Sequence, residues 1–277
     1  MTKVKNKHIG SNFDDFLQEQ NLLDECESSA KSETENLYHY CSLASFYGII
    51  SSKSIWLSAA SQSNDSKELT HFYNILDSVS YDVDMNVGKK KILQYSKWLP
   101  FFFCLSENDD LLSQWRYGAY ATGVAIGFNK SAIINLLKNT NAPQFQRVKL
   151  ANVIYNQDIQ KEIMTRCLSE GKLSELIHDF FPRFKNSSFF EEKEWRLFCG
   201  LVLGKDKFTS FDSIKFRVSD NKMLMHLEMS IKDYLSDLVR EIIIGPKSQM
   251  DERALSYFLM SNGLENVKIR TSNISLQ

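Results

Sequence analysis

The sequence predicts an α+β protein in which mixed, mostly antiparallel sheets are flanked by helices. Apolar segments typical of strands occur in clusters, for example at 99–106 and 123–128, rather than in the regular strand–helix alternation of parallel folds. Neither a G-x-G-x-x-G turn nor a Walker loop is present, which disfavours a doubly wound nucleotide-binding fold. The 19 Phe, 11 Tyr and 4 Trp, against only 11 Gly and 4 Pro, indicate a well-filled core with long elements.

The N-terminal third is expected to begin with a helix and to continue with two short strands. Apolar residues at helical spacing from Phe13 predict an amphipathic helix over 12–29. The aromatic segment 37–40 is typical of a strand, and Ser42 suits the N-cap of a helix over the apolar segment that follows. The other elements expected here are a strand at 54–58 and helices at 67–79 and 89–98.

The middle and the C-terminal part are richer in strands. Continuous apolar segments predict buried strands at 99–106 and 123–128, and the short helix between them begins with acids that suit the helix dipole. Alternation predicts a long strand at 193–203. Helices are expected at 131–139, 158–181 with a break at Gly171, and 248–261, and further strands at 145–155, 214–218, 223–229, 239–244 and 267–270.

The organisation expected is an N-terminal helical extension, residues 1–36, followed by a single α+β catalytic-type domain, residues 37–277. No repeat and no low-complexity linker divides the second region. The 33 Lys and Arg nearly balance the 34 Asp and Glu, for a net charge of -1. That balance argues against the broad basic surface that binds duplex nucleic acid.

The chain has the features of a cytoplasmic protein without a membrane partner. No apolar segment reaches the roughly 18 residues that a membrane-spanning helix needs, and the N-terminus lacks the apolar region of a secretory signal. The 5 cysteines are scattered and include no Cys-x-x-Cys pair. A disulfide framework or structural zinc site is therefore not expected, and a reducing compartment is.

Polar residues lie at the end of the first predicted strand and beyond the end of the second. His39 lies between Tyr38 and Tyr40, where a neutral imidazole can hold a sugar hydroxyl and a tyrosine can offer a stacking face. The alternative for His39 is a hydrogen-bonded, half-buried core residue. Beyond Ser58, at the end of the second strand, a polar turn carries Asn64, Asp65 and Glu68. This turn is either a helix cap or a cleft edge that offers oxygens to a ribose or a metal.

Two further segments carry candidate residues. Trp115 and Tyr120 can share a helix face, although a tryptophan in this position also suits a core anchor. Alternation places Glu192, Glu194 and Arg196 on one face of a strand. These charges either pair with one another or meet a ligand at a cleft, because burying them alone would be costly. The segment EIIIGP at 241–246 is interpreted as structural, a buried strand that ends at Gly245 and Pro246.

Taken in order, these segments resemble a large bacterial family of unknown function. Its signatures are LYHYT, L-S-x-NDP-x-E, a tryptophan–tyrosine segment that ends in GV-x-IGF, EKEWR and IIIGP, and the likeness covers about residues 37–246. Cys41 replaces the usual threonine, which can remove a hydroxyl contact, and Ser66 replaces the proline of the NDP turn.

That family in turn is remotely similar to the ADP-ribosyltransferase superfamily, and this resemblance implies an ADP-ribosyltransferase-like core. By this likeness Glu194 is the catalytic glutamate and His39 holds a ribose, while Trp115 or Tyr120 stacks on nicotinamide. The residues expected to contact the substrate NAD are Tyr38, Tyr40, Ser58, Asn64, Asp65, Trp115, Tyr120 and Arg196.

The resemblance implies an enzyme that cleaves the nicotinamide–ribose bond of NAD, acting as a bacterial toxin or phage-defence effector. It implies a protein or nucleic-acid acceptor if the enzyme is a transferase, and an inhibitory or activating partner from a defence system. No metal is expected. The first alternative is a metal-dependent nuclease in which Asp65, Glu68, Glu192 and Glu194 bind Mg²⁺. The second is a non-catalytic nucleotide-binding module.

Overall fold

The computed structural model describes residues 13–19, 35–62, 68–80, 98–117, 119–139, 148–202, 214–219 and 222–275. Contacts divide the chain into two compact units, Met1–Glu33 and Thr34–Gln277. In the first unit, helix α1 (Phe13–Glu19) covers the described part of the predicted helix at 12–29, and the rings of Phe13 and Phe16 stack on one side of it. The division into an extension at 1–36 and a catalytic-type domain at 37–277 stays a prediction.

The second unit contains the strands and the remaining helices. Its strands are β1 (Asn36–Cys41), β2 (Ser54–Ala59), β3 (Trp98–Ser106), β4 (Val124–Asn129), β5 (Lys149–Asn152), β6 (Glu194–Val202), β7 (Lys215–Ser219), β8 (Lys222–Ser230), β9 (Val239–Ile244) and β10 (Lys268–Thr271). Its α-helices are α3 (Leu43–Ser52), α4 (Glu68–Ser80), α6 (Leu112–Tyr117), α7 (Lys130–Asn139), α8 (Gln157–Ser169), α9 (Leu173–Glu175), α10 (Leu235–Leu238) and α11 (Glu252–Ser261). Shorter 3-10 or π turns are Ala60–Gln62, Leu176–Phe180, Phe181–Arg183, Ser187–Glu192 and Lys232–Tyr234.

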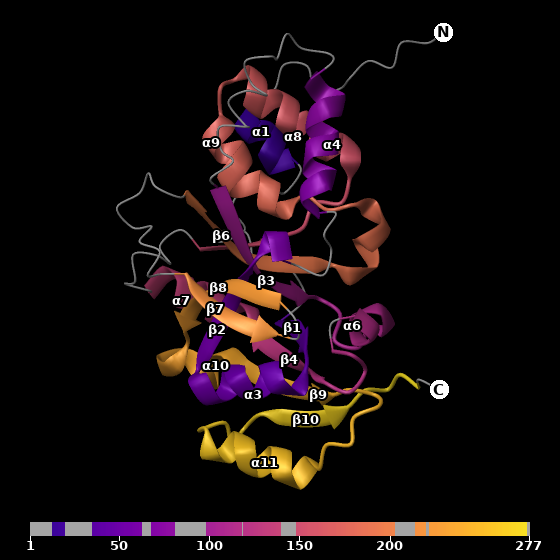
Figure 1. Cartoon of the computed structure of the whole chain (residues 1–277), viewed down its shortest axis with the longest axis vertical. Coiled ribbons are helices and arrows are strands. Elements are labelled where there is room, and N and C mark those ends of the chain that lie inside the picture. Colours follow the sequence, from indigo (N-terminus) through magenta and orange to yellow (C-terminus); the bar gives the residue numbers. More distant parts are fainter. Residues whose placement is uncertain are drawn as a thin grey trace. The chain divides into compact units, whose positions relative to one another are not determined.

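The described strands form one sheet in the order β10-β9-β4-β1-β3-β2-β8-β7, with β6 paired along β3 and β5 paired with β6. All of these pairs are antiparallel except β10 with β9. Figure 1 shows this sheet with α11 beside β10 at one end. The α+β class with a mixed, mostly antiparallel sheet and flanking helices is therefore confirmed.

One face of the sheet packs against helices to form the main core. Phe46 and Ile50 of α3, Ile133 of α7 and Leu255 of α11 are buried there. The strand residues in this core include Leu37, Ile55, Phe103, Ile126, Leu197 and Ile242. The opposite face carries smaller apolar clusters and several buried charged groups, so the search for a functional site concentrates on that face.

The edge of β3 is shared by two strands that diverge from each other. In its middle β3 pairs with β2, with Phe102 opposite Ser58, and at its end it pairs with β1, with Ser106 opposite Tyr38. Every second residue of a strand directs its backbone N–H and C=O groups to the same edge, so Phe102, Cys104 and Ser106 all face this edge of β3. Phe102 is paired by β2 and Ser106 by β1, which leaves Cys104 without a strand partner on this edge.

Several local predictions agree with the structure. Ser42 caps α3 and accepts a hydrogen bond from the Ser45 amide, and the chain breaks after α8 at Gly171, where φ is 72°. The last helix begins at Glu252 rather than at 248, because Asp251 accepts from the Arg253 amide and caps it there. Of the predicted helix at 89–98, only Trp98 is described, and it belongs to β3. Within the described residues, no helix is both long and apolar enough to span a bilayer.

Candidate active site

Glu194 begins β6 and carries a buried carboxylate that is 4% exposed. Alternate residues of a strand share a face, so Arg196 lies beside it and donates from Nε to Glu194 Oε1 over 2.6 Å. Lys185 approaches from the preceding loop, and its Nζ lies 2.6 Å from Glu194 Oε2. The same Nζ lies 2.6 Å from Glu192 Oε2. Two cations and two carboxylates thus form one network, which we call the Glu194 network.

The two carboxyl groups of this network differ in pKa. Burial alone would raise the pKa of Glu194, but Arg196 and Lys185 outweigh burial and lower that pKa to about 2. Burial raises the pKa of Glu192 even though Lys185 opposes the effect. Arg196 is further held because its Nη1 donates to the Pro182 carbonyl over 2.7 Å. Glu194 is therefore a fixed anion at neutral pH.

The segment that carries Glu194 is attached to the chain that leaves β3. Three side-chain hydrogen bonds join them: Ser106 Oγ to the Glu192 carbonyl (2.6 Å), Asn108 Nδ2 to the Glu191 carbonyl (2.7 Å) and Trp195 Nε1 to Glu107 Oε1 (2.9 Å). The two sequence motifs SENDD and EEKEW therefore form one structural unit, although more than 80 residues separate them.

His39 occupies the position on the edge of β3 that neither β1 nor β2 fills. Its Nδ1 lies 2.8 Å from the carbonyl oxygen of Cys104, and because a carbonyl only accepts, Nδ1 carries the hydrogen and donates. The imidazole stacks on Phe103, with ring centroids 4.0 Å apart. Burial lowers the pKa of His39 to about 4, and the charge of Arg217 acts in the same direction against the opposing bond to Cys104. At neutral pH His39 is therefore uncharged, and its Nε2 is a hydrogen-bond acceptor.

Cys104 connects the two predicted catalytic residues. Its carbonyl accepts from His39, and a hydrogen bond between its exposed side chain and Glu194 helps to lower the pKa of Glu194. Alternation along β3 places the Cys104 side chain on the face of Glu194, whereas Phe103, on which His39 stacks, faces the other way. His39 and Glu194 thus reach one residue from different sides of β3.

The two aromatic residues expected to stack on nicotinamide differ sharply in exposure. Trp115 is fully buried, and its Nε1 donates to Asp110 Oδ1 over 2.5 Å. Its ring packs edge-on against Tyr40 at 4.9 Å, so in this arrangement it anchors α6 and offers no face to a ligand. Tyr120 is 66% exposed and lies in a loop where its φ is 53°.

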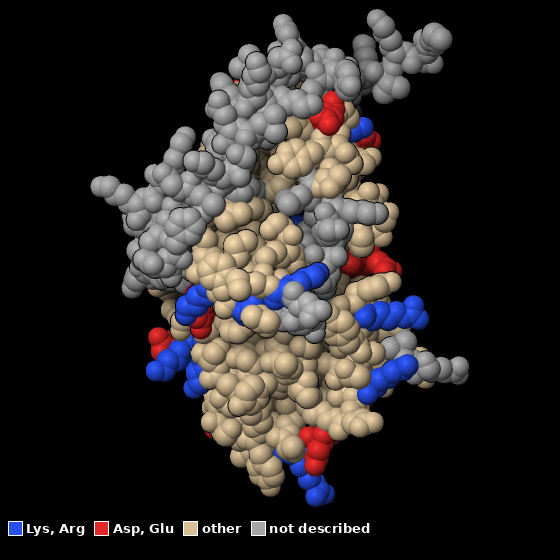
Figure 2. Space-filling model, in the orientation of Figure 1, with Lys and Arg blue, Asp and Glu red and all other residues tan. Residues whose placement is uncertain are grey.

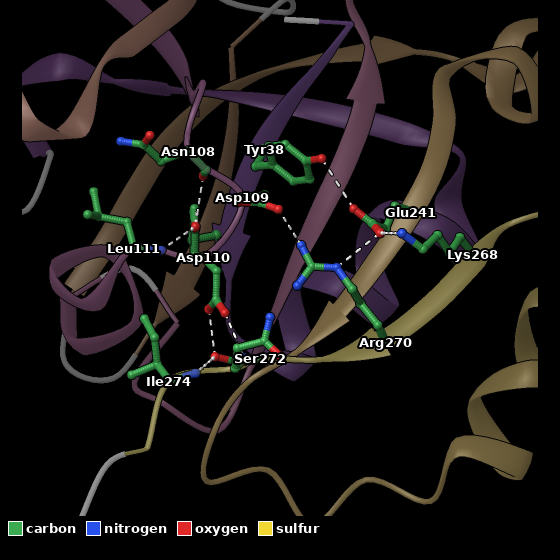
Figure 3. Close-up of polar contacts among 12 residues, drawn as sticks. Tyr38, Asn108, Asp109, Asp110, Leu111, Glu241, Lys268, Arg270, Ser272 and Ile274 are labelled. Atoms are coloured by element: carbon green, nitrogen blue, oxygen red, sulfur yellow. Dashed lines mark hydrogen bonds and ion pairs between the residues drawn. The ribbon is translucent and has the colours of Figure 1, made fainter.

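The hydroxyls of Tyr38 and Tyr40 are both engaged by the protein. Tyr40 donates to the Asn108 carbonyl over 2.8 Å. Figure 3 shows that Tyr38 donates to Glu241, at 3.2 Å, in a network that Arg270 extends to the loop before α6. These tyrosines therefore hold β1 to its neighbours, and a direct contact with NAD would have to use their rings.

The other residues predicted to contact NAD are spread over the fold or lie outside it. Ser58 is half-buried on β2, and Arg217 Nη2 lies 3.5 Å from its hydroxyl. Arg196 is 1% exposed and is held by Glu194. Asn64 and Asp65 lie outside the described residues.

The carboxylates of the alternative nuclease site are only partly placed. Glu192 and Glu194 both contact Lys185, while Asp65 and the side chain of Glu68 lie outside the described residues. Among the residues that the structure describes, no group of three or more His, Cys, Asp or Glu side chains is arranged to hold a metal ion.

Sequence reasoning missed a cluster of three side chains beside Ser58. Trp56 of β2, Arg217 of β7 and His226 of β8 lie against one another. The one available signal was an arginine between two apolar residues in the segment KFRVS.

Comparison with known protein families found a match over the central part of the chain. Residues 114–197 match the model of a family described as "Protein of unknown function (DUF2971)". The matched region runs from α6 into β6 and includes Trp115, Tyr120 and Glu194. No curated protein and no solved structure matches the chain. The expected likeness to a family of unknown function is thus supported over this region, and nothing in the comparisons supports similarity to ADP-ribosyltransferases.

Proposed function

We propose that the protein is an ADP-ribosyltransferase-like enzyme that cleaves the nicotinamide–ribose bond of NAD. The observation that carries the proposal is that Cys104 bonds His39 through its carbonyl and Glu194 through its side chain, which ties a neutral acceptor and a fixed anion, from different sides, to one residue of β3. Such a pair suits a reaction in which a sugar is held by hydrogen bonds while positive charge develops on it.

The chemistry needs a preorganised negative charge. When the bond between nicotinamide and ribose breaks, nicotinamide leaves with the bonding electrons and the ribose becomes oxocarbenium-like. A fixed carboxylate stabilises this charge without having to reorganise during the reaction. Both oxygens of Glu194 accept from cations, and Oε2 accepts from Lys185 and, over 3.2 Å, from Arg196 Nη2. In this proposal Lys185 releases Glu194 and keeps its contact with Glu192, so that Oε2 can also face the substrate.

His39 and Tyr120 have complementary roles in this proposal. The bond from Nδ1 to Cys104 sets the tautomer of His39, so that Nε2 can accept a hydrogen bond from a ribose hydroxyl. Of the two aromatic residues expected against nicotinamide, the exposed Tyr120 can offer a ring face. Attack by water on the ribose gives ADP-ribose, and attack by a protein or nucleic-acid acceptor gives a transferred ADP-ribosyl group.

The biological setting that we propose is that of a bacterial toxin or phage-defence effector, under the control of an inhibitory or activating partner. The resemblance of the sequence motifs supports this setting. We propose the cytoplasm as its location, because scattered free cysteines are typical of a reducing compartment and NAD is abundant there.

The test is the release of nicotinamide from NAD by the purified protein. We expect Glu194→Gln and His39→Asn each to lower the rate by about 100-fold or more, the range seen when an electrostatic contact to a transition state is removed. Glu191→Gln is the matched control, because it removes an exposed charge from the same segment. Thermal unfolding of each variant separates lost chemistry from lost folding.

The proposal fails if the wild-type protein releases no nicotinamide, transfers no label from NAD and causes no toxicity on expression. It also fails for Glu194 if a folded Glu194→Gln variant retains the wild-type rate. Metal-dependent cleavage of DNA or RNA that a chelator abolishes would support the nuclease alternative instead.

A further inference from the structure

On the sheet face opposite the main core, three neighbouring strands bring together two aromatic rings and a guanidinium. Ser58 of β2 lies opposite His226 of β8, which places the rings of His226 and Trp56 at 4.5 Å. The guanidinium of Arg217, from the edge strand β7, lies over the Trp56 ring at 5.3 Å. Its Nη2 reaches toward the Ser58 hydroxyl over 3.5 Å, which is long for a hydrogen bond. We call these four residues the Arg217 cluster.

The polar atoms of the Arg217 cluster are unusually poorly satisfied. Trp56 Nε1, Arg217 Nε and His226 Nδ1 are all buried, and none has a hydrogen-bond partner in the described part of the chain. Buried polar groups are nearly always paired, and leaving one unpaired costs about 1–3 kcal/mol. Three such atoms within one contact cluster therefore require an explanation, and a ligand absent from the free protein supplies one.

The charge of the cluster points to an anion. Arg217 forms no ion pair with a carboxylate in the described residues, and burial lowers its pKa. The nearby carboxylate, Glu228, is already paired with Lys215. Figure 2 shows Lys or Arg side chains (blue) across the β7–β8 hairpin, mostly among uncharged residues. Among the residues that the structure describes, no carboxylate thus neutralises the positive charge of the cluster.

We propose that Arg217, Trp56, His226 and Ser58 form a binding site for the phosphate group of a nucleotide. The planar guanidinium offers paired N–H groups that match phosphate oxygens, and the Trp56 and Ser58 side chains are additional donors. Because Arg217 covers the Trp56 ring in the free protein, binding moves the guanidinium toward the anion and gives Nε an acceptor. A phosphate ester fits these groups better than a carboxylate, because its several oxygens can engage all of the donors.

The position of the Arg217 cluster relates it to the proposed NAD chemistry. Ser58 lies opposite Phe102 of β3, two residues before Cys104, whose carbonyl accepts from His39, and the charge of Arg217 acts on the imidazole. A pyrophosphate bound by the cluster would therefore lie near the residue that is proposed to hold a ribose. Only this extension to a dinucleotide rests on the proposed function, since phosphate binding needs no cleavage of NAD.

Calorimetric titration of the whole chain with ADP tests the site, with inorganic pyrophosphate as a competitor and adenosine as the ligand without phosphate. We expect ADP to bind, pyrophosphate to compete, and adenosine not to bind. Arg217→Gln should weaken ADP binding by about tenfold or more, as expected for the loss of a charge-assisted hydrogen bond. Lys222→Gln, which removes an exposed charge from the same hairpin, should leave the affinity unchanged.

Several results would overturn the proposal. They are the absence of ADP binding at millimolar concentration, equal binding of adenosine and ADP, and equal affinity of Arg217→Gln and the wild-type protein. Without ligand, Arg217→Gln should change the melting temperature little, because the guanidinium loses its contact with the Trp56 ring but, within the described residues, no acid partner. A lower melting temperature together with lost binding would assign Arg217 a structural role instead.

The two proposals can fail separately. ADP binding without release of nicotinamide from NAD would leave the phosphate site standing and overturn the proposed function. Release of nicotinamide, together with an unchanged affinity for ADP and an unchanged KM for NAD in Arg217→Gln, would overturn the phosphate site and leave the proposed function standing.

Discussion

The Glu194 network makes a quantitative prediction about stability and pH. In the folded protein Arg196 and Lys185 outweigh the effect of burial and hold the pKa of Glu194 at about 2, whereas its ordinary value is 4.5. Glu194→Gln removes the charge and keeps the shape of the side chain. At neutral pH it leaves Arg196 and Lys185 with Glu192 as the one remaining carboxylate of the network.

The size of the effect follows from the lowered pKa. A difference of this size between the unfolded and folded states corresponds to about 3 kcal/mol of stability at neutral pH. Because the folded pKa is lowered, this stability is fully present above the unfolded pKa and is lost as the pH falls toward the folded one. At pH 3 about 2 kcal/mol of it should be gone. Burial, the largest cause of the raised pKa of Glu192, acts in the opposite direction in both proteins, while the smaller contribution from the Glu194 charge is lost in the variant.

Urea denaturation of wild-type and Glu194→Gln protein at pH 7, 5, 4 and 3 measures this difference. We expect the variant to be about 3 kcal/mol less stable at pH 7 and only about 1 kcal/mol less stable at pH 3. Glu191→Gln, with its exposed side chain, should follow the wild-type curve throughout. A gap between wild type and Glu194→Gln that stays constant from pH 7 to pH 3 would refute the reasoning.

Four further predictions concern two glycines, a polar anchor and the titration of a histidine. Gly123→Ala should destabilise the protein by several kcal/mol in urea denaturation, because its Cβ would lie 2.1 Å from the Cys41 carbonyl oxygen. Gly48→Ala in α3 meets nothing within 4 Å and should instead stabilise by about 0.5–1 kcal/mol. Asp110→Ala should cost about 2–3 kcal/mol, since it leaves the buried Trp115 N–H unpaired and releases the C-terminal segment, and an unchanged melting temperature would count against this anchor. NMR titration should show His39 neutral down to about pH 4, and a midpoint near 6.5 would contradict its burial.

The same buried ion pairs that stabilise the fold restrict what Glu194 can do. A catalytic anion must be held in place, yet one of its oxygens must become available to the substrate. In the proposed function Lys185 can release Glu194 and remain paired with Glu192, because its Nζ lies at the same distance from both carboxylates. A stabilising role and a catalytic role for Glu194 are therefore separable by experiment, the first through urea denaturation and the second through nicotinamide release.

Local sequence pattern was sufficient where neighbours along the chain decide the outcome. The Ser42 cap, the strand at β1 and the break at Gly171 depend on residues within one turn or one strand. Alternation likewise predicted that Glu194 and Arg196 share a face, and they form an ion pair. The pattern could not place Lys185 in this network, because that residue arrives from an irregular loop.

The sequence by itself determined the α+β class and the residues around which the candidate site is built. The tertiary structure alone decided that Trp115 is buried, that His39 fills the edge of β3 between two diverging strands, and that Arg217 meets Trp56. These outcomes depend on pairing between strands that lie far apart in the sequence, such as Ser58 of β2 with His226 of β8. Pairing of distant strands is set by the burial of whole faces, which no local pattern of residues specifies.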